Sequence, residues 1–533
     1  MRKSRLIAPL GVGAAVAAGC AAAGLATSST TFANVPSANT RSTGYAPVSM
    51  LSAGLQQIAV AQGSTKVDDP SAAVSYYGYD NDALNPAGDP EMVASPATGG
   101  TEAHKTEPDK NTYLVFKNGL TGPDRKYDYG THFLYQGHET GSPGYITRIN
   151  LDADAAHRVT VLATKDDTGA DIADIDGSTW DPWAQRLLFT TENQNAPTYS
   201  ATPNYPSRVH DVSGALGRGG YEGIQDDSAG NVWIVEDIGG SLKPGTTAKI
   251  PNSFLYRYVP KTPGDLAHGR LQVLQVLNDS GEPITQESQT PLQSPDQVAL
   301  HTYGKTFVTR WITIHDTAVD GSAPFNANVL AKAAHGTPFK RPENGQFRPG
   351  SHFTELYFDE TGDTNATSPE NDCCGGWGSV FKLTQSDPSA ADGTLTVFYN
   401  GDQAHAGFDN TAFFSADVIS FVEDAGDTLH GQRNALDSGY LLDVNVDYSK
   451  HFNQPVRWLA EGRDASATLD ADNGGFGKNE GDNEITGIHI SDGDPSSGGL
   501  LGAKTPKPFQ AGWRFFWTQQ HGDNVTWEVV RGS

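Results

Sequence analysis

Short apolar segments separated by turn residues recur along most of this chain, and they limit the folds it can adopt. The first of them are residues 112–116, 132–136, 145–151, 159–163 and 186–191, and similar segments continue to residues 514–519. They are rich in β-branched and aromatic residues and are bounded by Gly, Asp, Asn or Pro, as strands between tight turns are. No segment keeps a 3.6-residue apolar period over three or four turns. The pattern predicts an all-β protein.

The length of the chain favours a β-propeller over a single sandwich. A sandwich rarely needs more than about 400 residues, and this chain has 533. A unit of strand, turn, strand and acidic end also recurs several times, as blades do. We therefore predict one propeller of six blades over residues 71–533, with long loop insertions at residues 243–253, 323–350 and 464–499.

The first 33 residues have the features of a signal peptide. Positive charges at Arg2, Lys3 and Arg5 precede an alanine-rich apolar run from Leu10 to Leu25, which is too short for a membrane span. Residues 31–33, Thr-Phe-Ala, form a small-residue cleavage site. We expect a secreted, periplasmic or cell-envelope protein whose mature chain has no transmembrane segment.

Two further features concern the N-terminal region and the cysteines. Residues 34–70 are rich in Ser, Thr and Ala without periodicity, which predicts a linker or a loosely attached arm. Cys20 is either discarded with the signal peptide or carries a lipid anchor. Cys373 and Cys374 are adjacent, so they lack the spacing of a zinc site and form a free or mutually bonded pair in a loop.

The charge balance excludes one class of partner. The chain has 63 Asp and Glu against 37 Lys and Arg, a net charge of -26. A surface that binds nucleic acid needs a stripe of basic residues, and in this composition acidic residues outnumber basic ones. We interpret most of the acidic residues as part of a solvated surface. We expect a monomer that binds no nucleic acid.

Carboxylates next to predicted strands suggest a shared acidic centre. In residues 216–240, a glycine-rich turn presents Glu222, and the strand that follows ends at Glu236-Asp237. Four more acids lie in turns flanked by glycine, proline or aromatic residues: Glu139, Glu192, Glu343 and Asp409. In a propeller such strand ends converge on one mouth of the central channel. Their hard oxygen ligands suit Ca²⁺, Mg²⁺ or Fe³⁺.

The order of these motifs resembles the bacterial PhoX family of alkaline phosphatases. HETG, LLFTTEN, LGRGGYEG, RPEN, GFDN, EITG and QQHGDN follow one another from about Tyr127 to near the end of the chain. The resemblance implies a six-bladed propeller whose central site holds iron and calcium ions. It implies metal ligands at Glu139, Glu192, Glu222, Glu343 and Asp409, with Asp237 as a further one. Arg341 would bind the substrate phosphate through paired hydrogen bonds. His521 is a second catalytic candidate.

Three positions depart from the family pattern. Thr191 stands in place of the iron-binding cysteine, Tyr221 in place of a histidine and Asn344 in place of an aspartate. Loss of the thiolate removes the softest iron ligand and leaves an all-oxygen site. We therefore expect Ca²⁺, with Fe³⁺ as the alternative.

These features predict a secreted, metal-dependent phosphomonoesterase. The expected chemistry is attack on phosphorus by a hydroxide or oxide held by the cations, and no G-x-S-x-G elbow supplies a protein nucleophile. Two alternatives stay open. One is a calcium-dependent propeller that hydrolyses a lactone or sugar ester. The other is a non-catalytic secreted propeller with a structural Ca²⁺, which the changes at Thr191, Tyr221 and Asn344 favour.

Overall fold

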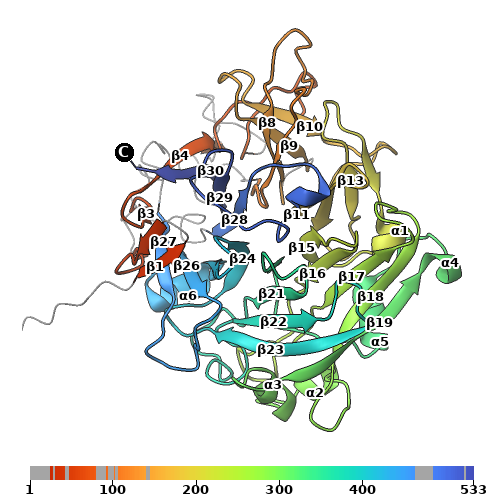
Figure 1. Cartoon of the computed structure of the whole chain (residues 1–533), viewed down its shortest axis with the longest axis vertical. Helices are drawn as coiled ribbons and strands as arrows, with labels where there is room; N and C mark the ends of the chain where they lie inside the picture. Colours follow the sequence, from red (N-terminus) through yellow and green to blue (C-terminus); the bar gives the residue numbers. More distant parts are fainter. Residues whose placement is uncertain are drawn as a thin grey trace, which may run out of the picture.

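Strands dominate this protein and are grouped into sheets that stand around a common centre (Figure 1). The computed structural model describes residues 24–27, 30–41, 47–79, 92–93, 101–102, 106–139, 144–462, 484–520 and 524–532. His521, Cys20 and most of the predicted signal peptide lie outside these residues. The predicted all-β class is confirmed, with sheets in a propeller-like arrangement.

Two four-stranded antiparallel sheets come first around the centre. One has the order β10-β9-β8-β7 and contains β7 (Thr112–Val115), β8 (His132–Gly137), β9 (Ile146–Asn150) and β10 (Val159–Ala163). The next contains β11 (Ile175–Asp181), β12 (Arg186–Thr191), β13 (Tyr199–Ala201) and β14 (Val209–Asp211). In both sheets the strands pair in sequence order, as in a meander.

A nine-stranded sheet follows, with the order β15-β16-β17-β18-β19-β23-β22-β21-β20. Its first five strands are β15 (Tyr221–Asp226), β16 (Val232–Glu236), β17 (Leu255–Pro260), β18 (Gly269–Val276) and β19 (Phe307–Asp316). The others are β20 (Gly345–Phe347), β21 (Glu355–Glu360), β22 (Ser379–Gln385) and β23 (Asp392–Asn400). Its two end strands also approach each other, since Gln225 Nε2 of β15 donates to Gly345 O of β20 at 2.8 Å.

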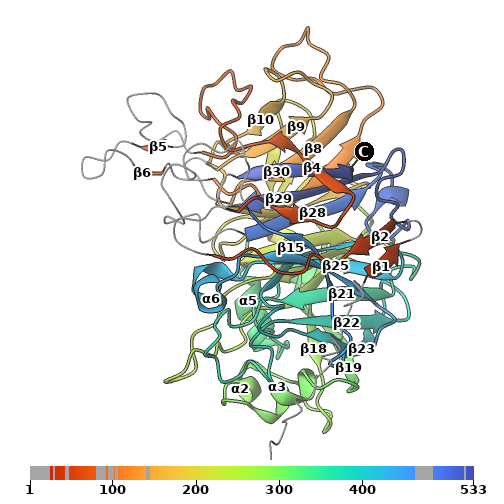
Figure 2. The same cartoon turned by 90° about the vertical axis from the view of Figure 1, so that its left-hand side faces the viewer.

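Two more sheets complete the arrangement, and each takes a strand from the N-terminal part of the chain. The sheet of β24 (Phe408–Phe413), β25 (Val418–Glu423), β26 (Ser438–Asp443) and β27 (Val456–Ala460) is extended by β3 (Met50–Leu51). The sheet of β28 (Glu484–Ser491), β29 (Arg514–Gln520) and β30 (Val525–Arg531) is completed by β4 (Leu55–Ala61). Figure 2 shows β4 beside β30. The segment 34–70, predicted as a linker or arm, thus contributes two strands to the sheets.

The remaining elements are short. Two-stranded sheets are formed by β1 (Gly24–Thr27) with β2 (Thr30–Ala33) and by β5 (Met92–Val93) with β6 (Thr101–Glu102). The helices are α1 (Ser213–Leu216), α2 (Gln286–Gln289), α3 (Pro295–Leu300), α4 (Thr317–Asp320), α5 (Ala327–Ala333), α6 (Gly426–Arg433) and a 3₁₀ turn at Ser497–Gly499. In the described part of the chain, none of them has the length and apolarity to cross a membrane.

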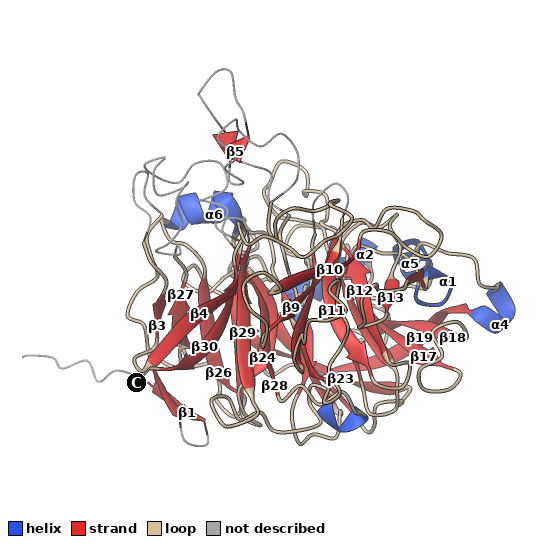
Figure 3. Cartoon of the chain, turned by 90° about the horizontal axis from the view of Figure 1, so that it is seen from above, coloured by secondary structure: helices blue, strands red, loops and turns tan. Residues whose placement is uncertain are grey.

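Six end strands of the sheets, called the first strands below, form a closed ring, and the nine-stranded sheet contributes both of its ends, β15 and β20. β7 lies next to β11, β11 next to β15, β15 next to β20, β20 next to β24, β24 next to β28 and β28 next to β7. The sheets extend outward from this ring, and the loops collect at its two ends (Figure 3). Residues at one end of these six strands therefore meet across the centre.

Apolar side chains fill the space between neighbouring sheets. Trp233 of β16 is 1% exposed and packs edge-on against Trp311 of β19 and Phe347 of β20, each with ring centroids 5.1 Å away. Edge-to-face pairs of this kind add about 1 kcal/mol each beyond the area they bury. These contacts hold the two ends of the nine-stranded sheet together. The site at the ring's end is therefore built on a packed scaffold.

Candidate metal centre

Acidic residues gather at one end of the ring because of strand direction. The sheets are antiparallel, so each first strand begins where the second strand ends: Ile175 pairs with Thr191, Tyr221 with Glu236 and Phe408 with Glu423. An acid stands at or just before the start of every first strand: Asp109, Asp176, Glu222, Glu343, Asp409 and Glu484. Acids that follow second strands, such as Glu192 and Asp237, reach the same end.

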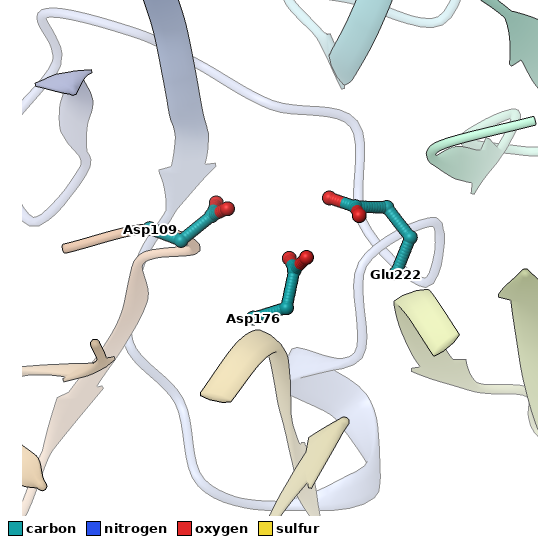
Figure 4. Close-up of side chains that lie close together, drawn as sticks. All are labelled: Asp109, Asp176 and Glu222. Carbon is teal, nitrogen blue, oxygen red and sulfur yellow. The ribbon is translucent and has the colours of Figure 1, made fainter. Parts of the chain in front are cut away.

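Three groups of carboxylates at this end are close enough to share ions. In each group one oxygen of every residue lies within 4.8 Å of the others, and the groups are Glu139–Asp176–Glu192, Asp109–Asp176–Glu222 and Glu222–Glu343–Asp409. Figure 4 shows the second group, with its three carboxylates turned toward one another. Asp176 and Glu222 each belong to two groups, so the three groups form one continuous carboxylate centre.

Burial makes ionisation of the carboxylates in this centre unfavourable unless cations are bound. Asp176 and Asp409 are 2% exposed and Glu222 is 4% exposed. Burial raises the pKa of Asp176 well above its usual range, and the nearby Asp109 adds to the effect. Burial likewise raises the pKa of Glu222, with Asp176 and Glu343 as further causes. Crowded carboxylates resist ionisation in this way until a cation neutralises them.

Several carboxylate oxygens lack any hydrogen-bond partner. Among the described residues, Asp176 Oδ1, Asp237 Oδ1 and Asp409 Oδ2 are buried and accept no hydrogen bond. A buried charged group without a partner costs several kcal/mol. A hard cation satisfies such oxygens, and the donor set contains carboxylates and no thiolate. The residues present therefore fit Ca²⁺ or another hard ion.

Arg341 lies at the edge of the carboxylate centre. Its Nε donates to Asp237 Oδ2 at 2.9 Å, and its Nη2 lies 3.2 Å from Glu343 Oε1 and 3.5 Å from Asp424 Oδ2. The side chain keeps 17% of its surface exposed. These three contacts use Nε and Nη2 of a side chain that carries five N–H donors.

The backbone holds Arg341 in an uncommon conformation. Its φ is +52°, in the left-handed region that non-glycine residues seldom adopt. Its carbonyl accepts from Thr361 N at 2.8 Å. The neighbouring Lys340 is fully buried and bonds Asp363 and Glu370 through its ammonium group. Such strain persists where surrounding contacts fix it, and it is concentrated at functional sites.

Lys110 brings a second positive charge into the centre. It is 6% exposed, and its Nζ donates to Asn410 Oδ1 at 2.9 Å and to Asn344 Oδ1 at 3.2 Å. Burial lowers the pKa of this ammonium group, and the surrounding acids, led by Asp409 and Asp109, oppose that shift.

A cavity of about 480 Å³ opens over one side of the centre. Glu139, Glu192 and Asp237 line it together with Asp174, Asn193, Gln194, Asn195, Ile238 and Gly239. The cavity reaches the group that contains Asp176, whereas Glu343 and Asp409 lie deeper. A small ligand in this cavity would contact the metal-binding acids from the solvent side.

The structure brings together every predicted site residue that it describes. Glu139, Glu192, Glu222, Glu343 and Asp409 belong to the three groups, and Asp237 pairs with Arg341. His521 lies outside the described residues, but its neighbour Gln520 donates to Asp109 Oδ2 at 3.2 Å and to Glu139 Oε2 at 3.1 Å.

Asp109, Lys110 and Asp176 of the centre were not predicted. A signal for Asp176 was present, because Asp176-Gly177 repeats the acid-glycine pair of Glu222-Gly223. Glycine is needed at both positions. A Cβ on Gly177 would lie 2.0 Å from Glu222 O, and one on Gly223 would lie 2.9 Å from Glu343 O.

Two of the three positions that depart from the family pattern bond locally, and the third contacts Lys110. Thr191 Oγ1 donates to Pro197 O at 3.1 Å, and the Tyr221 hydroxyl donates to Leu216 O at 2.8 Å. Asn344 Oδ1 accepts from Lys110. Thr191 and Tyr221 thus have structural partners outside the carboxylate centre. The adjacent cysteines Cys373 and Cys374 are bonded to each other.

We expect cation binding to depend on pH through Glu192. Burial and then Asp237 raise the pKa of Glu192 from 4.5 to about 7. The metal-free folded protein therefore holds a proton that the unfolded chain loses, so its stability falls as the pH rises from 4.5 through 7. A cation needs the ionised carboxylate, so Ca²⁺ should bind about tenfold more weakly at pH 6 than at pH 8 and should release protons.

Calorimetry in buffers with different ionisation heats measures both the affinity and the proton release. Glu192→Gln should reduce the pH dependence, while Glu139 and Asp176, whose pKa values are also raised, retain their part of it. Equal affinities at the two pH values in the unchanged protein, with no proton release, would contradict the assignment of Glu192 to the metal centre.

The fold and the site together define a propeller-like β protein with a buried carboxylate centre at one end of its ring. No protein-family model matches the sequence, and no curated protein matches it either. The fold is similar to the structure of Pseudomonas fluorescens PhoX in complex with vanadate, a transition state analogue. That comparison covers 93% of this chain and 98% of the other, with 11% identity and a TM-score of 0.51.

Two other structures match less well. A putative gluconolactonase has 11% identity over 67% of this chain and 88% of its own, with a TM-score of 0.27. An auxiliary nutrient binding protein from Bacteroides thetaiotaomicron has 9% identity over 84% of this chain and 82% of its own, with a TM-score of 0.33. The likeness to PhoX concerns the fold.

Proposed function

We propose that this protein is a secreted, metal-dependent phosphomonoesterase. The observation that carries the proposal is a continuous centre of buried carboxylates with the guanidinium of Arg341 at its edge. Carboxylates that hold cations beside an arginine suit a doubly charged phosphate ester. The PhoX structure that shares the fold was solved in complex with vanadate, a transition state analogue.

The roles of this chain's residues follow from their positions. Glu139, Asp176 and Glu192 would hold a cation at the floor of the 480 Å³ cavity. Bound cations neutralise charge on phosphate oxygens and lower the pKa of coordinated water. Asp176 and Glu222, which each belong to two groups, would keep neighbouring ions at a fixed spacing.

Arg341 would bind the phosphate group of the substrate. Asp237 Oδ2, at 2.9 Å from Nε, fixes the orientation of the guanidinium plane. The exposed part of the side chain is then available for phosphate oxygens, which guanidinium groups bind with paired hydrogen bonds. No protein nucleophile is needed, because the residues supply binding, orientation and charge.

We further propose that the nine-stranded sheet represents two blades. The order β15-β16-β17-β18 repeats the meander of the other sheets, as does β20-β21-β22-β23. Strand β19 bridges their outer edges by pairing with both β18 and β23. Counted in this way, the ring has six blades, and each first strand carries one acid of the centre.

A non-catalytic propeller with structural cations is the second candidate. Lys110 favours it, because this buried ammonium group contacts Asn344 and Asn410 inside the centre, and a built-in positive charge partly replaces metal ions. Such a protein would bind Ca²⁺ without turning over a phosphate ester.

Hydrolysis of a chromogenic phosphate monoester distinguishes the two candidates. We expect release of phosphate by the full chain with added Ca²⁺, loss of that activity in a chelator, and recovery when Ca²⁺ is restored. Parallel assays with Fe³⁺ and with a chromogenic lactone or carboxylic ester test the alternative metal and substrate. A folded, calcium-loaded protein that releases no phosphate under any metal supplement would reject the phosphatase.

A further inference from the structure

We propose that the ammonium group of Lys110 occupies a cation position of the carboxylate centre and so limits where metal ions bind. The inference rests on the metal-binding part of the proposed function and is independent of catalysis. Lys110 lies two residues before β7 and projects into the ring, where its side chain meets residues of two distant sheets.

The contacts of Lys110 resemble those of a bound cation. Its Nζ is surrounded by oxygens: Asn410 Oδ1 at 2.9 Å and Asn344 Oδ1 at 3.2 Å accept from it. These asparagines directly follow two candidate ligands, Asp409 and Glu343. Carbonyl oxygens next to carboxylates are also what Ca²⁺ binds. The ammonium group therefore lies in an environment that an ion of similar size and sign would accept.

The protein's positive charges are unevenly distributed over the three groups. In Glu222–Glu343–Asp409, Lys110 interacts electrostatically with Glu222 and Asp409, and Arg341 Nη2 lies 3.2 Å from Glu343. Glu343 thus has a basic partner in contact, whereas Lys110 acts on Glu222 and Asp409 at longer range.

The group at the cavity has less neutralisation from the protein. The electrostatic partners that raise the pKa of Glu139 are all acids, led by Glu192 and Asp176. Those of Asp176 are also acids, Asp109 and Glu192. Asp176 Oδ1 is buried and has no partner. Arg341 lowers the pKa of Glu192, but its effect is smaller than the increases caused by burial and by Asp237.

This uneven distribution of positive charge predicts where metal ions bind in the centre. The cavity side, Glu139–Asp176–Glu192, needs an external cation, whereas Lys110 and Arg341 bring two positive charges to the side of Glu343 and Asp409. Metal ions would therefore bind first where the cavity admits a substrate. The opposite side, where Asp409 Oδ2 still has no partner, would hold fewer ions as long as Lys110 is present.

Removal of the ammonium group tests this assignment. In Lys110→Ala the side chain is shortened and its space is open to an ion among the oxygens of Asn344, Asn410 and Asp409. We expect this variant to bind one more Ca²⁺ per chain than the unchanged protein, measured by equilibrium dialysis after treatment with a chelator. Lys110→Met removes the charge but fills the space, so it should gain no ion and should unfold at a lower temperature.

A second measurement uses a substitute for the missing group. Ethylammonium should raise the unfolding temperature of calcium-free Lys110→Ala and should compete with the additional Ca²⁺, with little effect on the unchanged protein. If Lys110→Ala is unfolded in the presence of chelator, its refolding on addition of Ca²⁺ or ethylammonium supports the inference equally. An unchanged or lower Ca²⁺ count in a folded Lys110→Ala, or no recovery with either cation, would overturn the inference.

These results separate the inference from the proposed function. A protein that gains an ion in Lys110→Ala but hydrolyses no phosphate ester retains the inference and loses the phosphatase. A protein that hydrolyses the ester with no gain of an ion in Lys110→Ala retains the phosphatase and loses the inference.

Discussion

Replacement of Arg341 by lysine is expected to slow hydrolysis of a phosphate monoester by about a hundredfold, with the Ca²⁺ content unchanged. Lysine keeps the positive charge beside Asp237, Glu343 and Asp424, so the carboxylate centre stays neutralised. It cannot offer the planar, paired N–H donors that match phosphate oxygens. Steady-state kinetics with a chromogenic monoester, together with metal analysis of the same sample, measures both quantities.

Arg348→Lys is the matched control. Arg348 follows β20 at the end opposite the carboxylate centre and pairs with Glu355 at 3.0 Å and Asp417 at 2.7 Å. This change should leave hydrolysis within about twofold of the unchanged protein, because surface ion pairs contribute little. Equal rates for Arg341→Lys and the unchanged protein would remove Arg341 from substrate binding.

Asp176→Asn is expected to have the second large effect, a loss of Ca²⁺ affinity of about a hundredfold and of activity with it. Asp176 belongs to two of the three groups, and its Oδ1 has no protein partner. Asparagine preserves the shape of the side chain and removes one charge from both groups. Calcium titration by calorimetry gives the affinity, and saturating Ca²⁺ should restore part of the activity.

Asp181→Asn tests whether the loss of Ca²⁺ affinity in Asp176→Asn comes from the metal centre or from a disturbance of strand β11. Asp181 ends β11, the strand in which Asp176 is the second residue, and its carboxylate accepts from the N–H groups of Trp183 and Ala184. This variant should lose stability by about 1 kcal/mol and keep its Ca²⁺ affinity. Similar calcium affinities for both variants would show that Asp176 is no ligand.

The outer strands were predictable from the sequence. Strands β10 and β12 match the predicted segments 159–163 and 186–191 residue for residue, and β25 extends its segment, residues 418–422, by one residue. These strands are buried between sheets, where β-branched and aromatic residues pack, and hydrophobic patterning detects that environment. The all-β class followed directly from them.

The inner strands were not predictable from the same pattern. β11 reads IDGSTWD, β15 reads YEGIQD and β24 reads FDNTAF. They line the centre of the ring, so their inward residues are polar or glycine, and such sequences resemble turns. Apart from β7 (Thr112–Val115), which lies within the predicted segment 112–116, the first strands were missed because they carry the site.

The acidic residues of the centre also divide into those that the sequence pattern identified and those that it did not. Glu192 and Asp237 were found because they directly follow apolar strands, β12 and β16. Asp109 and Asp176 lie at the start of inner strands with no apolar run before them, and they were missed. Glu222 and Asp409 lie on inner strands too and were found through their motifs, LGRGGYEG and GFDN. The convergence of the predicted acids required only that antiparallel strands alternate in direction. The position of Lys110 depends on contacts across the ring with residues 344 and 410, which no local pattern encodes.

The pairing of β4 with β30 makes the order of synthesis important. Residues 55–61 bond to residues 526–531 and to no earlier strand of that sheet. A growing chain therefore holds residues 55–61 without their partner strand until residues 526–531 have been made, and such unpaired edges favour association with other chains. A polypeptide cut short before Val525 would stay an open arc, prone to aggregation and exposed to proteases, however well its other sheets had formed.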